Sequence, residues 1–103
     1  MTIVNKSYSN IIWTENNIKN VPEKPGVYVL MNKDKRFFYI GYSKDRLSSR
    51  LFDHFRMFDD KTRRFITKIR WFRWFQCDTA ESAAILEKDM IKRLKPIYNE
   101  KVN

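Results

Sequence analysis

The chain has 103 residues and a formal net charge of +9, with 43% hydrophobic and 16% aromatic residues. This length suits one domain, and the hydrophobic content excludes a disordered basic tail. One cysteine and one histidine exclude an internal disulfide, a multi-cysteine zinc site and a histidine-pair metal site. No apolar run reaches the ~20 residues of a membrane span, and no export signal starts the chain, so we expect a cytoplasmic protein with no membrane partner.

In chain order, the apolar periodicity and the breakers predict a series of short elements. They are a helix over 15–20, strands over 27–31 and 37–42, helices over about 46–57 and 61–68, a strand over 69–77 and a helix from 79 to about 94. Thr14 is the expected cap of the first helix, and Asp78 with Glu81 is the expected capping box of the last. A four-residue hairpin loop at 32–35 joins the first two strands. The series predicts an α+β fold, with a small three-stranded antiparallel sheet flanked by helices.

The positive charge is concentrated in the middle of the chain. Residues 44–75 carry a net charge of +6, whereas residues 76–87 carry −3. The basic excess indicates a polyanionic partner, with nucleic acid as the first candidate. A basic surface beside a small acidic spot suits metal-assisted phosphodiester chemistry, because the metal binds carboxylate and the nucleic-acid backbone binds cations. The alternative is that Asp78 and Glu81 only favour a helix N-terminus.

Polar side chains occupy the apolar faces of the two main helices. On a helical wheel Glu87 falls at the centre of the apolar face of the last helix, where a carboxylate is costly unless it is paired or binds metal. His54 falls at the centre of the other apolar face, and Arg50 lies one turn earlier with a guanidinium fork that suits phosphate. The alternatives are a structural salt bridge for Glu87 and a hydrogen-bonded core position for His54.

The hairpin and the basic stretch add further candidates. A loop centred between residues 33 and 34 would place Tyr28 directly opposite Tyr39, so that two hydroxyls converge, although a plain aromatic pair gives the same pattern. Farther along, cations interleave with Trp71 and Trp74, which suits phosphate contact and base stacking; the alternative is a solvated face beside a core strand. These cations are Lys61, Arg63, Arg64, Lys68, Arg70 and Arg73.

Read in order, these residues resemble the GIY-YIG nuclease superfamily. The matching segments are Gly26-Val27-Tyr28, Tyr39-Ile40-Gly41, Ser43-Lys44-Asp45, Arg50-Leu51 with His54, and Leu86-Glu87 followed by Ile91, Pro96, Tyr98 and Asn99. Each motif is short, but five in the right order over about 20–99 are specific, and the spacing from Glu87 to Asn99 resembles that of the repair-incision branch. The resemblance implies a nuclease domain over 21–103, with residues 1–20 as an N-terminal extension packed on it.

The resemblance also implies divalent-metal-dependent hydrolysis of a phosphodiester, with a role for each matching residue. Glu87 would hold a single Mg²⁺ or Mn²⁺, and Arg50 would neutralise the scissile phosphate. Tyr28 would act as general base or orient the attacking water, and we expect Arg50, His54 and the metal to favour its ionised form. Tyr39 would position phosphate or water, and His54 would assist through a hydrogen bond. The supporting positions are Gly41, Lys44 and Asn99.

Two departures from the family pattern bear on the site. Tyr42 stands where many members have Lys, a cation that Lys44 would partly replace, and an extra residue in the arginine helix lets Arg46 compete with Arg50. Arg46 is also an expected nucleic-acid contact. We expect an endonuclease that acts on DNA with low intrinsic sequence specificity, prefers branched, damaged or single-stranded DNA, or is directed by a targeting protein. The alternatives are a non-catalytic nucleic-acid-binding module of the same fold and a module that binds an acidic protein.

Overall fold

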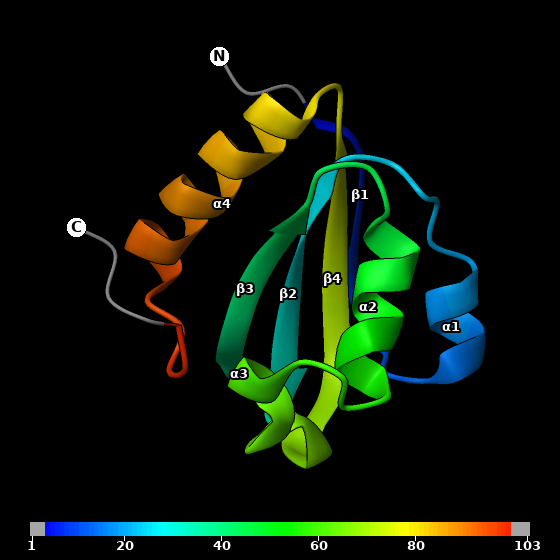
Figure 1. The fold of residues 1–103 in the computed structure, drawn as a ribbon. Helices are drawn as coiled ribbons and strands as arrows, with labels where there is room; N and C mark the ends of the chain where they lie inside the picture. Colours follow the sequence, from blue (N-terminus) through cyan, green and yellow to red (C-terminus); the bar gives the residue numbers. More distant parts are fainter. Residues whose placement is uncertain (1–3, 100–103) are drawn as a thin grey trace.

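The computed structural model describes residues 4–99, in which helices cover both faces of an antiparallel sheet (Figure 1). The elements are β1 (Val4–Ile12), α1 (Glu15–Lys19), β2 (Gly26–Asn32), β3 (Phe37–Ser43), α2 (Leu47–Phe55), α3 (Asp60–Arg63), a 3₁₀ turn η1 (Ile66–Lys68), β4 (Ile69–Cys77) and α4 (Ala80–Leu94). The strand order is β1-β4-β2-β3, and every neighbouring pair is antiparallel. The predicted α+β class is confirmed. Among these helices none is long and apolar enough to cross a membrane.

Strand β1 is a fourth strand that the sequence pattern does not predict. It pairs with β4 from Val4↔Cys77 to Ile12↔Trp71, and its register shifts twice along the way. Asn10 lies between those ends with a φ of 58°. Such irregularities break the alternation of side chains by which a strand is recognised in a sequence. The sheet therefore gains a strand from a segment without a clear apolar period.

Two groups of apolar side chains cover the two faces of the sheet. Along the central strand β2, Val27, Val29 and Met31 belong to the group that packs with α4, whereas Tyr28 and Leu30 belong to the group that packs with α1 and α2. This division follows from the two-residue period of a strand, which sends successive side chains to opposite faces. Tyr28 is thereby placed beneath α2, on the face away from α4.

Helices α1 and α4 start at hydroxyl caps. Thr14 caps α1, as predicted. The capping box of α4 is formed by Thr79 and Ser82, because the Thr79 hydroxyl accepts the Ser82 amide at 3.0 Å and the Thr79 amide donates to the Ser82 hydroxyl at 3.2 Å. The predicted box of Asp78 and Glu81 is wrong by one residue, since a serine hydroxyl can return the hydrogen bond that a glutamate usually makes.

The predicted hairpin register is also wrong. Tyr28 pairs with Gly41, and Leu30 pairs with Tyr39. The loop begins one residue later than expected, and a register shift follows Leu30, so the pairing moves by two positions along β3. A Cβ added at Gly41 would overlap the Tyr28 hydroxyl and ring. The missing side chain at Gly41 is therefore what makes room for the phenol.

We expect Gly41→Ala to lower the free energy of unfolding by ~1–3 kcal/mol, because the added methyl group overpacks the space that holds the Tyr28 ring. Urea unfolding measures this change. A double-mutant cycle with Tyr28→Ala tests the cause, since Gly41→Ala should cost much less once the ring is gone. Additive losses in the cycle would show that the overlap with Tyr28 does not set the cost.

Candidate active site

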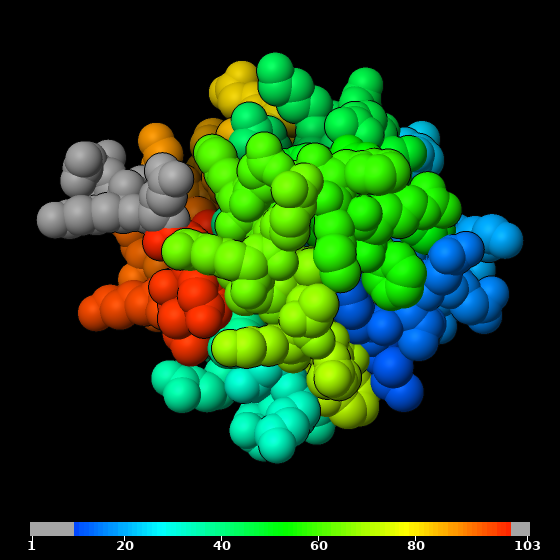
Figure 2. All heavy atoms as spheres, turned by 60° about the horizontal axis from the view of Figure 1, so that its bottom comes forward, coloured from blue at the N-terminus to red at the C-terminus, as the bar shows by residue number. Residues whose placement is uncertain are grey.

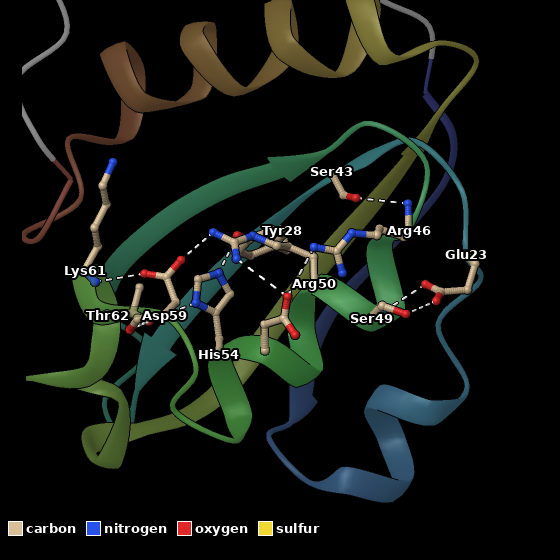
Figure 3. A network of polar contacts seen from close by, with 11 residues as sticks. Glu23, Tyr28, Ser43, Arg46, Ser49, Arg50, His54, Asp59, Lys61 and Thr62 are labelled. Carbon is tan, nitrogen blue, oxygen red and sulfur yellow. Dashed lines mark hydrogen bonds and ion pairs between the residues drawn. The ribbon is translucent and has the colours of Figure 1, made fainter.

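A hydroxyl and an imidazole meet inside the core beneath α2 (Figure 3). Tyr28 is 1% exposed and His54 is 0% exposed, and the Tyr28 Oη lies 2.5 Å from the His54 Nε2. The ring of Tyr39, from β3, lies 6.5 Å from that of Tyr28 and 5.7 Å from that of His54, measured between centroids. The two tyrosines therefore converge, as diagonal neighbours rather than as the directly opposed pair that was predicted.

The second nitrogen of His54 is also engaged. Its Nδ1 lies 2.8 Å from the hydroxyl oxygen of Thr62, a fully buried residue of α3. Burial, followed by the charge of Arg50, lowers the pKa of His54 to about 4. The imidazole is therefore neutral at pH 7, with one N–H group and one bare nitrogen. The structure agrees with a hydrogen-bonded core position for His54, and it gives that position a tyrosine partner.

Arg50 is held against this pair by two aspartates. Its Nη2 lies 2.5 Å from the Asp59 carboxylate, and its Nη1 lies 3.8 Å from that of Asp53. Burial is the largest effect and would raise the pKa of Asp59, but the hydrogen bond and charge of Arg50 and the other nearby groups together outweigh it, and the pKa is lowered. The Asp59 carboxylate also accepts the Lys61 amide at 2.8 Å. Asp59 therefore stays ionised and fixes the plane of the guanidinium.

The phenol of Tyr28 is strongly protonated. Burial, helped by Tyr39, raises its pKa well above the ordinary value, while Arg50 acts in the opposite direction. Of the groups expected to favour the ionised form, Arg50 acts in that direction, but burial outweighs it and His54 carries no charge. Tyr28 can give up its proton only to an acceptor in direct contact, and His54 Nε2 is in that position.

Glu87 lies on α4, which packs on the other face of the sheet (Figure 1). It is half-buried and lies on the same side of the helix as the buried residues Ala83 and Met90, four residues after the first and three before the second. Burial raises the pKa of Glu87. Within residues 4–99 no hydrogen bond or ion pair reaches its carboxylate, so the structural salt bridge is not found there.

A carboxylate without a partner can accept a divalent cation. The described part of the chain holds no cluster of three or more His, Cys, Asp or Glu residues that could bind a metal. A metal at Glu87 would therefore have one carboxylate ligand from these residues and would fill its other positions with water or phosphate oxygens. That arrangement suits Mg²⁺, which dehydrates reluctantly and is commonly held by one or two carboxylates.

The supporting residues lie along β3 and the loop after it. Asn99 grips the edge strand, since its Oδ1 accepts the Ile40 amide and its Nδ2 donates to the Ile40 carbonyl, each at 2.7 Å. Lys44 and Arg46 line a shallow groove together with Arg50. Arg46 is more exposed and pairs with Asp53 at 3.3 Å. Arg50 is thus the arginine whose charge acts on Tyr28 and His54.

Apart from Arg46, the cations predicted to contact nucleic acid lie on α3, directly after it, on η1 and on β4. Helix α3 and η1 are at the end of the molecule that Figure 2 brings forward. Most of these cations are exposed, whereas Arg73 is half-buried over the ring of Phe37. The exposed ones are Lys61, Arg63, Arg64, Lys68 and Arg70. Trp74 is 5% exposed in the core, and Trp71 is covered by the ammonium group of Lys35 at 4.7 Å. The cations are thus available to a polyanion, and the tryptophans belong to the sheet packing.

Asp59 and Thr62 are contacts of the site that the sequence analysis missed. Asp59 carries a weak signal, because it is an acidic residue inside the most basic stretch of the chain. Thr62 carries none, since a threonine in a short helix predicts no particular contact. Both enter the site because α3 turns back toward α2, a long-range arrangement that local patterns do not encode.

The depressed pKa of His54 predicts a pH-dependent stability. The unfolded chain takes up a proton near pH 6.5, whereas the folded chain resists it down to about pH 4, so stability is lost as the pH falls through this window. We expect the free energy of unfolding to fall by ~2 kcal/mol between pH 7 and pH 5 from this group. Urea unfolding at several pH values measures the fall, and His54→Gln should flatten it over the same range. An equal pH dependence in both proteins would contradict this.

Comparisons with known proteins match most of this chain. A sequence profile of the UvrC-like GIY-YIG domain matches residues 24–100. UvrABC system protein C of Bacteroides thetaiotaomicron is 38% identical over 84 residues, which cover 80% of this chain and 14% of that protein. Its counterpart in Aquifex aeolicus is 41% identical over 87 residues, which cover 82% of this chain and 15% of that protein. The chain thus spans about one seventh of the length of these curated relatives.

Solved structures give the same result. The GIY-YIG N-terminal endonuclease domain of UvrC from Thermotoga maritima, bound to its catalytic divalent cation magnesium, superposes with a TM-score of 0.73. It is 33% identical in sequence, and the match covers 82% of this chain and 93% of that domain. A point mutant of that domain with its cation gives a TM-score of 0.74 at 31% identity. The resemblance seen in the sequence motifs is confirmed, and the chain belongs to the family of UvrC-like GIY-YIG domains.

Proposed function

We propose that the chain is a divalent-metal-dependent endonuclease that cleaves DNA phosphodiester bonds. The observation that carries the proposal is the contact between the Tyr28 hydroxyl and His54 Nε2, at 2.5 Å, beside the guanidinium of Arg50. A protein that only bound nucleic acid would have no use for a buried phenol and imidazole next to a phosphate-binding group. The endonuclease function of the related UvrC domain supports the same reaction.

Arg50 and Tyr28 act on the two partners of the reaction. The guanidinium of Arg50 is 27% exposed and already oriented by Asp59, so it can neutralise a scissile phosphate without first losing side-chain freedom. Tyr28 hydrogen-bonds the attacking water and takes its proton as its own proton moves to His54. Tyr39 stands beside Tyr28 and positions the same water or the phosphate. General base catalysis of this kind contributes ~10²–10⁴-fold to a rate.

Glu87 is the residue that would hold a Mg²⁺ or Mn²⁺ ion. Its carboxylate is half-buried and has no ion-pair partner in residues 4–99, which fits a metal ligand whose charge is compensated by the cation. The bound ion would act as a Lewis acid toward the phosphate oxygens. The magnesium ion of the related UvrC domain supports this assignment.

The substrate we propose is DNA with little sequence preference, selected by its structure or by other proteins. The exposed cations around α3 and η1 contact backbone phosphates, which carry no sequence information. Several relatives are components of the UvrABC system, which supports a role in DNA repair and cleavage directed by a protein partner.

We expect Glu87→Gln to lose Mg²⁺-dependent and Mn²⁺-dependent cleavage by at least ~100-fold, because the amide cannot compensate a cation. The assay incubates supercoiled plasmid, single-stranded DNA and branched DNA with each metal or with EDTA. Glu81→Gln is the matched control, since Glu81 is an exposed glutamate of the same helix. Tight DNA binding without cleavage by the wild-type protein would favour the non-catalytic module.

The basic surface gives a separate prediction. Arg63→Ala combined with Arg64→Ala should weaken DNA binding and reduce the slope of log affinity against log salt by ~0.9 for each lost phosphate contact. Lys92→Ala with Arg93→Ala, on the exposed side of α4, removes the same charge as a control. Fluorescence anisotropy over a salt series gives both quantities. Equal slopes for the two double variants would show that α3 is only solvated surface.

A further inference from the structure

Three buried polar side chains, beginning with the proposed catalytic Tyr28, are joined by a continuous series of hydrogen bonds. The Tyr28 Oη contacts His54 Nε2 at 2.5 Å, and His54 Nδ1 contacts Thr62 Oγ1 at 2.8 Å. The Thr62 hydroxyl in turn lies 3.4 Å from the backbone carbonyl oxygen of Asp59. All three side chains are at most 1% exposed, so solvent competes little for their hydrogen bonds. Figure 3 shows this series running from β2 through α2 to α3.

The direction of the hydrogen bonds follows from the donors available. Tyr28 has His54 as its hydrogen-bond acceptor within residues 4–99, and the neighbouring Arg50 can only donate. If His54 donated to Tyr28, the buried hydrogen of the phenol would have no acceptor, at a cost of ~1–3 kcal/mol. Tyr28 therefore donates to Nε2, and the single proton of the neutral imidazole sits on Nδ1.

The hydrogen bonds of Thr62 run in the same direction as the one from Tyr28 to His54. Its hydroxyl has one hydrogen, and the Asp59 carbonyl can only accept it. This bond to the carbonyl three residues earlier is a common one for threonine in a helix. The lone pairs of the Thr62 oxygen are then left to accept the Nδ1–H group of His54.

We propose that Thr62 is a positioning residue that holds His54 in the Nδ1–H tautomer, so that bare Nε2 can take the proton of Tyr28. The proposal rests on the proposed nuclease function. The proton moves from the Tyr28 oxygen to Nε2 in the same step in which that oxygen takes a proton from the attacking water, so that no separate phenolate has to form in the buried core. The resulting hydroxide bonds to phosphorus as the bond from phosphorus to the leaving oxygen breaks. The leaving oxygen takes a proton from solvent, and the imidazolium returns its proton to solvent after the product leaves. Thr62 itself exchanges no proton.

Helix α3 places Thr62 and the partner of Arg50 on one short turn. Asp59 is the N-cap of α3, its carboxylate holds Arg50, and its carbonyl accepts the Thr62 hydroxyl. The tautomer of His54 and the orientation of Arg50 are therefore set by the same four residues of chain. A shift in the position of α3 would therefore disturb His54 and Arg50 together.

The test uses the fact that the chain has one histidine. Long-range ¹H–¹⁵N correlation spectra of ¹⁵N-labelled protein identify which imidazole nitrogen carries the proton. The wild type should show the Nδ1–H tautomer at pH 7. Thr62→Val, which keeps the shape and removes the acceptor, should shift His54 toward the Nε2–H form. Thr62→Ser should restore the wild-type pattern, and Thr67→Val, at an exposed position, should leave it unchanged.

Single-turnover cleavage gives the second readout. Thr62→Val should lower the cleavage rate by ~10-fold or more with DNA affinity unchanged, and Thr62→Ser should recover most of it. An Nε2–H tautomer in the wild type overturns the proposal, and this measurement needs no variant to fold. Equal losses in the Val and Ser variants also overturn it, because they indicate packing alone. A wild type with the expected tautomer but no cleavage overturns the nuclease and the proton transfer, while the hold of Thr62 on His54 stands.

Discussion

The hydrogen bond between Tyr28 and His54 is the constraint on which the surrounding structure depends. A hydroxyl and an imidazole buried in an apolar core are each destabilising by ~1–3 kcal/mol if left without a partner. Gly41 leaves space for the phenol, and Thr62 satisfies the second imidazole nitrogen. Among the side chains that the structure describes, in residues 10–99, no buried nitrogen or oxygen lacks a partner. These buried polar side chains thus form a network in which each member is hydrogen-bonded. That is the condition under which a core tolerates polar atoms.

Burial keeps this pair neutral, and the charge of Arg50 adds to this effect at His54. Arg50 lies close enough to oppose a charge on His54, and it is itself tied to Asp59 and Asp53. The ion pairs lie at the margin of the core, with 27% of the Arg50 side chain and 11% of Asp59 exposed. An incoming phosphate can therefore meet the guanidinium from the solvent side while the aspartates keep its plane. A lysine at this position would offer a point charge without that fixed plane.

The parts of the fold that follow local periodicity could be predicted from the sequence, whereas those set by pairing between distant segments could not. Thr14, the α2 face around His54 and the strand before Cys77 follow local rules, and they appear as expected. The Tyr28 and Gly41 pairing depends on a register shift near a turn, which no alternation of residues reveals. Thr62 entered the site through the tertiary position of α3. The sequence therefore indicated Tyr28, His54 and Arg50 as site residues, but it did not reveal the groups that orient them.

The proposed reaction needs two halves of a site that lie on different faces of the sheet. Tyr28 and His54 are on the α2 face, and Glu87 is on α4, so the edge strand β3 stands between them. Asn99 holds that edge through both backbone groups of Ile40. It thereby ties the segment after α4 to the strand that carries Tyr39. An edge strand ordinarily has unpaired backbone groups and the freedom to fray; here the amide of Asn99 removes that freedom at the point where a phosphate would have to span the metal ligand and the general base.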